Sequence, residues 1–169
     1  MISSPRLILK PLSDKQLIKY IANDGSLEAE LKLNPTSKVI TPELREALEE
    51  TILPSVADTG KNHLFSTLWT VILKSESRMV GDLCFVGEPD GEGQIELGYG
   101  TYEAYRGNGY MTEAVACLIE WVKQHENVKS IFAQTAKDNP ASFAVLKKNN
   151  FEKTGEDETL FNWKLVIEH

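Results

Sequence analysis

The sequence predicts a single α+β domain, and three observations predict it. Its 169 residues are about the length of one domain. β-branched and aromatic runs follow one another in the middle of the chain, as in a meander of antiparallel strands. Segments with helical spacing lie before and after these runs. Because no linker, repeat or low-complexity tract divides the chain, we expect residues 1–169 to fold as one unit.

The first third of the chain begins with a strand and continues with two helices. Residues 6–12 form a short apolar stretch that is interrupted by proline, which indicates a strand. Ser13 then caps a predicted helix that runs to about Asn23. Thr41 caps a second amphipathic helix, with proline at its first position and Pro54 near its end. Residues 26–40 between the two helices show no clear pattern.

The rest of the chain alternates strands and helices. Apolar runs separated by polar or glycine-rich turns predict strands, and apolar residues at helical spacing predict helices. The expected strands are 68–73, 79–86, 94–100, 130–135 and 160–167, and the expected helices are 111–122 and 141–149.

Composition and charge exclude several classes of function. The chain has 18 Lys+Arg and 25 Asp+Glu, and the net charge of −7 opposes binding to nucleic-acid phosphates. Cys84 and Cys117 lie in apolar runs without metal-ligand spacing, and the histidines are scattered, so we expect reduced thiols, no metal and a cytoplasmic protein. No run reaches the ~18 apolar residues of a membrane span, and the N-terminus has no signal-peptide core, so no membrane partner is expected.

A glycine-rich turn joins the third strand of the predicted meander to the helix that follows. Residues 105–110 read Tyr-Arg-Gly-Asn-Gly-Tyr. A helix N-terminus behind such a turn presents unpaired backbone N–H groups and the positive end of the helix dipole, which favour a phosphate group. Taken alone, a glycine pair before a helix is more often only a turn. The spacing matches neither GxGxxG nor GxxxxGK[ST], which disfavours dinucleotide and ATP-hydrolysing chemistry.

Residues Arg106–Met111 resemble the acyl-CoA pyrophosphate motif Gln/Arg-x-x-Gly-x-Gly/Ala of the GNAT superfamily of N-acetyltransferases. Arg106 matches the first position and Gly109 the fourth, whereas Met111 replaces the small last residue, where it either crowds the turn or packs into the core. Further segments resemble other motifs of the superfamily, and the opening segment resembles its RimJ/RimL-like ribosomal-protein alanine acetyltransferase branch. These segments are Gln94–Tyr99, Tyr110–Ala114, Asn139–Ser142, Lys148–Phe151 and, for the branch, Pro5–Leu12.

The resemblance implies a three-layer GNAT fold, in which helices flank a mixed, mostly antiparallel sheet. It also implies direct transfer of an acetyl group from acetyl-CoA to a primary amine in a ternary complex, without a metal. In the family, the strand that corresponds to residues 94–100 separates from its neighbour and pairs with the pantetheine arm. The residues that the resemblance places at acetyl-CoA are Leu97, Gly98, Tyr99, Arg106, Gly107, Asn108, Gly109, Tyr110, Met111, Thr112, Asn139 and Ser142.

Three side chains are the candidate catalytic groups. Glu96 alternates with apolar neighbours and faces away from them, so it is a candidate general base, although a solvated strand glutamate is the alternative. Asn139 either caps the following helix or binds the pantetheine amides. Ser142 either assists protonation of the sulfur, as the resemblance suggests, or only bonds locally. The tyrosine acid that many family members carry seven residues after this Asn is replaced by Leu146.

The acceptor is the least defined part of the prediction. Residues 86–103 contain five acidic residues and no Lys or Arg, which favours a cationic amine. The resemblance covers acceptors that are protein N-termini and acceptors that are small-molecule amines, and a homodimer rests on it alone. The alternative function is a catalytically weak acyl-CoA-binding sensor or interaction module of the same fold, which Met111 and Leu146 keep open.

Overall fold

The computed structural model describes residues 1–58, 60 and 62–169. Within these residues eight strands form one sheet in the order β1-β2-β3-β4-β5-β6-β8-β7, in which only β5 and β6 pair in parallel. The α+β class and the meander of β3, β4 and β5 are therefore confirmed. The strands are β1 Ile2–Ser3, β2 Leu7–Pro11, β3 Leu68–Leu73, β4 Arg78–Phe85, β5 Gln94–Thr101, β6 Ser130–Ala136, β7 Glu152–Glu156 and β8 Leu160–Val166.

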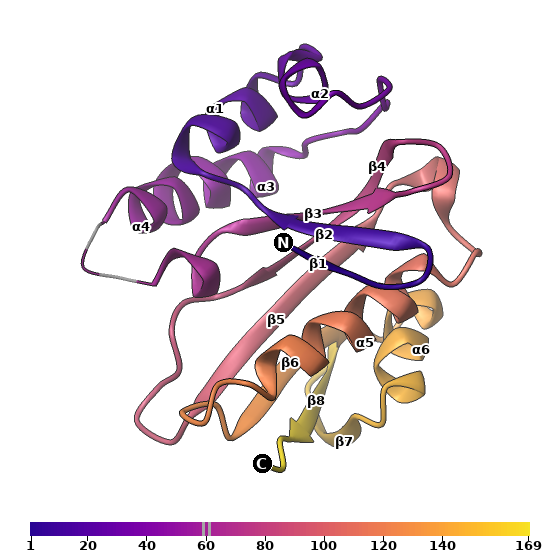
Figure 1. The fold of residues 1–169 in the computed structure, drawn as a ribbon. Helices are drawn as coiled ribbons and strands as arrows, with labels where there is room; N and C mark the ends of the chain where they lie inside the picture. The colour runs from indigo at the N-terminus through magenta and orange to yellow at the C-terminus, as the bar shows by residue number, and fades with distance from the viewer. Residues whose placement is uncertain (59, 61) are drawn as a thin grey trace.

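Helices cover both faces of the sheet (Figure 1). One face carries α1 Asp14–Ala22, α2 Ser26–Leu31, α3 Pro42–Ala47, the π-helical segment η1 Leu48–Ile52 and α4 Leu53–Ala57. The other face carries α5 Tyr110–Val122 and α6 Pro140–Lys148. Two short 3₁₀ segments, η2 His63–Phe65 and η3 Glu103–Tyr105, lie in connections. A separate apolar core lies on each face. None of the helices in the described part has the length and hydropathy that a bilayer crossing requires.

Local capping explains where α1 begins and ends and where α3 begins. Ser13 and Gln16 form a capping box at the start of α1, and Asn23 ends that helix in the left-handed conformation. Thr41 caps α3, with Pro42 in its first turn.

The structure corrects the prediction in the less regular segments. The expected single helix after Thr41 contains the π-helical segment η1, because Pro54 has no N–H to donate to the preceding turn. The unassigned residues 26–40 include α2. Strands β1 and β7 were not predicted, because β1 has two residues and the β7 sequence Glu-Lys-Thr-Gly-Glu is polar.

A buried polar cluster attaches α1 to the sheet. The Tyr20 hydroxyl donates to Asp82 Oδ2 at 2.6 Å, and the Tyr102 hydroxyl lies 3.0 Å from each carboxylate oxygen of Asp82. Next to it, Lys38 pairs with Glu28 at 3.5 Å, and both side chains are almost fully buried. Burial raises the pKa of Asp82 from 3.8 to about 6, and the two tyrosine hydroxyls oppose that rise only in part.

We expect Asp82→Asn to remove part of the pH dependence of stability. Because the pKa of Asp82 is higher in the folded chain than in the unfolded chain, the free energy of unfolding should rise as the pH falls through about 6 toward about 4. The free energy of unfolding should therefore differ by about 3 kcal/mol between a pH at which Asp82 is ionised in both the folded and the unfolded chain and a pH at which it is protonated in both. Urea unfolding at several pH values measures the effect, with Asp138→Asn at an exposed site as the control. An unchanged slope in Asp82→Asn would contradict it.

Candidate functional site

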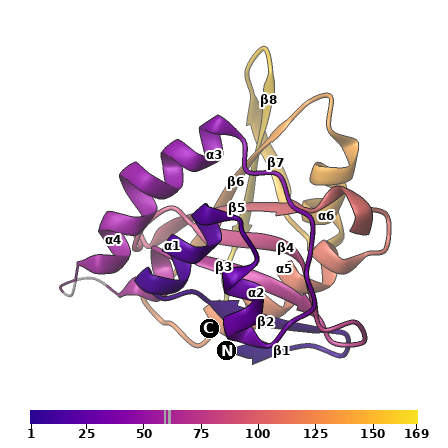
Figure 2. The same cartoon turned by 90° about the horizontal axis from the view of Figure 1, so that it is seen from above.

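The sheet opens between β5 and β6. Strand β5 pairs with β4 as far as Thr101, but it pairs with β6 only from Gln94 to Glu96, although both strands continue further. Figure 2 shows β7 and β8, which continue the sheet beyond β6, at a steep angle to β3–β5. Because successive residues of a strand point their backbone groups to alternate sides, part of the N–H and C=O groups from Leu97 to Thr101 face this gap.

The glycine-rich turn lies beside the gap and holds backbone donors without acceptors. Gly107 and Gly109 have φ of 79° and 77°, which favour glycine, and Gly109 begins α5 without a side-chain cap. Within the described residues, the backbone N–H groups from Gly107 to Thr112 donate to no acceptor. They lie at the positive end of the α5 dipole, so the turn can receive an anionic group such as a phosphate.

Met111 does not obstruct the turn. Its side chain is 6% exposed and belongs to the core beneath α5, where its terminal methyl lies close to Gly81. Met111 was expected either to crowd the turn or to pack into the core, and in the structure it packs into the core. The Met111 backbone N–H is still one of the unpaired N–H groups at the turn.

Arg6, which the sequence did not single out, holds the turn from behind. Its Nη1 donates to the Asn108 carbonyl at 3.0 Å, and its Nε pairs with Glu113 at 2.7 Å. The guanidinium also lies over the Tyr110 ring, 4.8 Å from the centroid. Ser4 and the Arg6 backbone N–H donate to the same Glu113 carboxylate. The opening segment thus fixes the glycine-rich turn.

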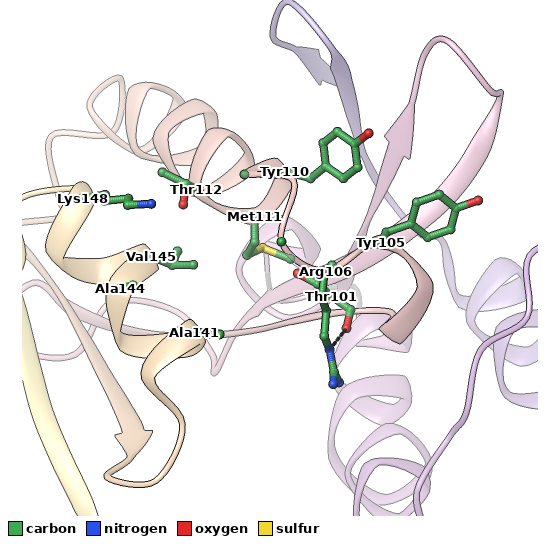
Figure 3. A pocket seen from close by; sticks show the side chains of 12 residues that line it. Thr101, Tyr105, Arg106, Tyr110, Met111, Thr112, Ala141, Ala144, Val145 and Lys148 are labelled. Carbon is green, nitrogen blue, oxygen red and sulfur yellow. Dashed lines mark hydrogen bonds between the residues drawn. The ribbon is translucent and has the colours of Figure 1, made fainter.

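A groove leads from the turn to the gap. A cavity of about 240 Å³ lies at the turn, and a second cavity of about 210 Å³ extends from it between β5 and α6. The two share Thr101, Arg106, Met111, Ala141 and Val145. Figure 3 shows Thr112, Lys148 and Val145 around the turn end. At the gap end, the lining residues are Tyr99, Gly100, Asn139 and Ser142.

Two lysines of α6, Lys147 and Lys148, and the arginine of the turn lie in different surroundings. Lys148 lines the groove, whereas Lys147 covers the Phe143 ring at 5.1 Å. The Nε of Arg106 donates to the Thr101 carbonyl at 3.2 Å, and its side chain extends away from the first turn of α5 (Figure 3). Lys148 and Arg106 therefore both line the groove at the turn.

At the gap end, Asn139 and Ser142 meet Tyr99. The Asn139 side chain accepts from the Ser142 N–H at 3.2 Å, so it caps α6. The Tyr99 hydroxyl donates to the Ser142 carbonyl at 2.7 Å and lies 3.4 Å from Ser142 Oγ. Burial raises the pKa of Tyr99, although its bond to Ser142 opposes the rise. Sequence reasoning considered only the backbone of Tyr99 and did not detect its hydroxyl.

The opposite face of the sheet carries Glu96 and Cys84. Ile95 and Leu97 lie in the core beneath α5, so Glu96 between them faces the α1–α4 side. Cys84 lies directly opposite Gly98 on the neighbouring strand. Burial and the nearby carboxylates of Asp82 and Glu96 raise the pKa of the Cys84 thiol to about 11. At neutral pH Cys84 is therefore a protonated thiol and a poor nucleophile.

A further cavity opens on this second face. It has a volume of about 450 Å³ and shares Thr101 and Arg106 with the groove. Its other lining residues come from the segments 37–39 and 102–104. The two cavities thus approach the end of β5 from different sides.

Some of the acidic residues in segment 86–103 form hydrogen bonds with backbone N–H groups in or near the loop between β4 and β5. Asp90 accepts from the N–H groups of Glu92 and Gln94, and Glu88 accepts from the Asn62 N–H at 2.6 Å. Asp90 thus stabilises its own loop, and Glu88 joins that loop to the segment before η2. Both carboxylates therefore give weaker support for a cationic acceptor than the sequence suggested.

A sheet that opens beside a glycine-rich turn at a helix N-terminus, with cavities on both sides, defines the acyl-CoA N-acyltransferase class of fold. The chain belongs to the acetyltransferase (GNAT) domain family, whose model matches residues 6–152.

A relative from Bacillus subtilis, the uncharacterized N-acetyltransferase YjdG, is 37% identical over 98 residues, which are 58% of each protein. The match thus spans little more than half the length of this relative. The solved structures with a similar fold include the following two. RimL, a ribosomal alpha-N-protein acetyltransferase in complex with coenzyme A, has a TM-score of 0.67 at 18% identity, covering 97% of this chain and 96% of that one. Spermidine N-acetyltransferase from Vibrio cholerae, in complex with CoA and spermine, has a TM-score of 0.66 at 13% identity, covering 96% of each chain.

Proposed function

We propose that this protein is an acetyl-CoA-dependent N-acetyltransferase that transfers the acetyl group directly to a primary amine in a ternary complex. One observation carries the proposal. The groove begins at the unpaired N–H groups of the glycine-rich turn, ends at the β5–β6 gap, and meets a second cavity near Thr101. A donor and an acceptor can therefore approach one point from two sides.

The residues of the groove fit acetyl-CoA, which supplies an acetyl group activated as a thioester. The N–H groups from Gly107 to Thr112 suit its pyrophosphate, and Lys148 adds a positive charge at the same end. The open edge of β5 from Leu97 to Thr101 offers backbone partners for the amides of an extended arm.

Groups of the protein polarise the acetyl carbonyl and remove the proton of the amine. Backbone N–H groups between Leu97 and Tyr99 polarise the acetyl carbonyl. Glu96, which lies on the other face but does not line the second cavity, takes the proton from the ammonium through water and leaves a neutral amine. The raised pKa keeps the Cys84 thiol protonated at neutral pH, which supports direct transfer over an acetyl-cysteine intermediate.

The acceptor is a primary amine, either a protein N-terminus, as the RimJ/RimL-like sequence features favour, or a small-molecule amine. Both kinds of acceptor occur among proteins that share the fold: RimL is an alpha-N-protein acetyltransferase, and the Vibrio cholerae protein is a spermidine N-acetyltransferase. We place the reaction in the cytoplasm, because Cys84 and Cys117 are free cysteines.

Thiol release from acetyl-CoA tests this proposal. The protein is incubated with acetyl-CoA and a panel of polyamines, amino-acid amides and peptides with free N-termini, and CoA binding is measured by calorimetry. Release that depends on one class of amine supports the enzyme and identifies the acceptor. Tight CoA binding without release for any amine would instead support the sensor or interaction module. Absence of CoA binding would overturn both.

A further inference from the structure

Acetyl transfer to an amine leaves a sulfur that must gain a proton or be stabilised as a thiolate of pKa ~8.5. A suitable donor has to lie at the gap end of the groove. Among the residues that line the cavity of about 210 Å³, those with a hydroxyl group are Tyr99, Thr101 and Ser142. A phenol is a much stronger acid than an aliphatic alcohol, so Tyr99 is the better donor.

We infer that the Tyr99 hydroxyl is the proton donor to the leaving sulfur, an inference that rests on the proposed acetyl transfer. Tyr99 lies on β5 where the sheet opens, and its hydroxyl reaches across to the first turn of α6. Its side chain lines the cavity of about 210 Å³ together with Asn139 and Ser142. The raised pKa of Tyr99 keeps the phenol protonated at neutral pH.

The hydroxyl can turn toward the groove without leaving a buried group unpaired. Its present acceptor, the Ser142 carbonyl, lies within α6, where the helical pattern supplies an N–H four residues later. The Tyr99 bond to this carbonyl is therefore an additional one. Ser142 Oγ, 3.4 Å from the phenol oxygen and half-buried, connects Tyr99 to the solvent side of the groove.

The proposed step balances in protons and electrons. The amine nitrogen bonds to the acetyl carbon, and the carbon–sulfur bond breaks with its electron pair remaining on sulfur. Tyr99 gives its hydroxyl proton to that sulfur. Glu96, which has already passed the ammonium proton to solvent, removes the second proton that the nitrogen loses as the amide forms. Ser142 returns a proton to Tyr99 and regains one from water, while Glu96 releases its proton to solvent.

Tyr99→Phe tests the inference, because it removes only the hydroxyl. We expect kcat to fall about 10²-fold with little change in KM for acetyl-CoA. Tyr20→Phe is the matched control, since it removes a buried phenol hydroxyl on the other face of the sheet, and it should leave kcat unchanged. Unchanged kcat in Tyr99→Phe would overturn the inference.

Two readouts do not depend on turnover. The ultraviolet absorbance of the thiolate gives the pKa of the CoA thiol bound to the protein. A hydrogen bond from Tyr99 should lower this pKa below that of free CoA, and Tyr99→Phe should raise it by about one unit. Desulfo-CoA, which lacks the thiol, should bind wild type and variant equally well, and this also shows that the variant is folded.

Each outcome separates the two proposals. If no amine gives thiol release but the bound thiol titrates as expected, acetyl transfer fails while the contact of Tyr99 with sulfur stands. A bound thiol in the wild-type protein that titrates like free CoA would overturn the role of Tyr99 without reference to any variant. Equal weakening of CoA and desulfo-CoA binding by Tyr99→Phe would also overturn it, because it would indicate a structural role in holding α6.

Discussion

Glu96→Gln is expected to lower kcat about 10³-fold at neutral pH with little effect on acetyl-CoA binding. The substitution keeps the shape of the side chain but removes the group that takes a proton from the acceptor. Glu96 lies on the face of the sheet away from the groove, so the amide should leave the cofactor contacts intact. Steady-state kinetics with the amine identified by thiol release measure the change in kcat, and the Kd for CoA measures any change in cofactor binding.

The pH profile gives the Glu96 prediction its sharper form. Without a base, the rate depends on the amine that is already neutral in solution, so it should rise about tenfold per pH unit below the pKa of the acceptor. Glu126→Gln, an exposed glutamate between α5 and β6, serves as the control and should keep the wild-type profile. If Glu96→Gln kept the full rate at every pH, Glu96 would be a solvated strand residue and not the base.

The features that the sequence predicts well depend on neighbouring residues. Helix α1 was predicted from its cap and its C-terminal asparagine, and the glycine-rich turn from a spacing of a few residues, because these signals act locally. Alternation of apolar residues along β5 likewise places Glu96 on its own face.

The features that escaped prediction depend on contacts between distant segments. Arg6 holds Glu113 across 107 positions, and no local pattern marks either residue as part of the turn. The Tyr99 hydroxyl reaches Ser142, 43 positions away, and only the packing of α6 on the sheet brings them together. The opening between β5 and β6 was expected from the family resemblance alone, because strand propensity does not reveal where two strands stop pairing.

Gly81 is a position where the sheet has no room for a side chain. On β4 it lies opposite Thr101, and an added Cβ would lie 2.6 Å from the Gly100 carbonyl oxygen and 3.1 Å from the terminal carbon of Met111. The first neighbour is backbone, so relief requires β4 and β5 to move apart. Such a movement would displace the end of β5 that borders both the groove and the second cavity.

Gly81→Ala is therefore expected to lower the free energy of unfolding by about 3 kcal/mol, at the upper end of ordinary overpacking in a core. The same shift should weaken CoA binding, because it moves the backbone that faces the gap. Gly100→Ala on the facing strand is the matched control for stability: its added Cβ meets no atom within 4 Å, so we expect a change within about 0.5 kcal/mol. Urea unfolding and calorimetric CoA titration of both variants provide the measurements.

If Gly81→Ala unfolded at the same urea concentration as the wild type, β4 and β5 would have to be less closely packed than this structure has them. A loss of stability with unchanged CoA affinity would show that the opening beside β5 keeps its shape independently of the β4–β5 contact.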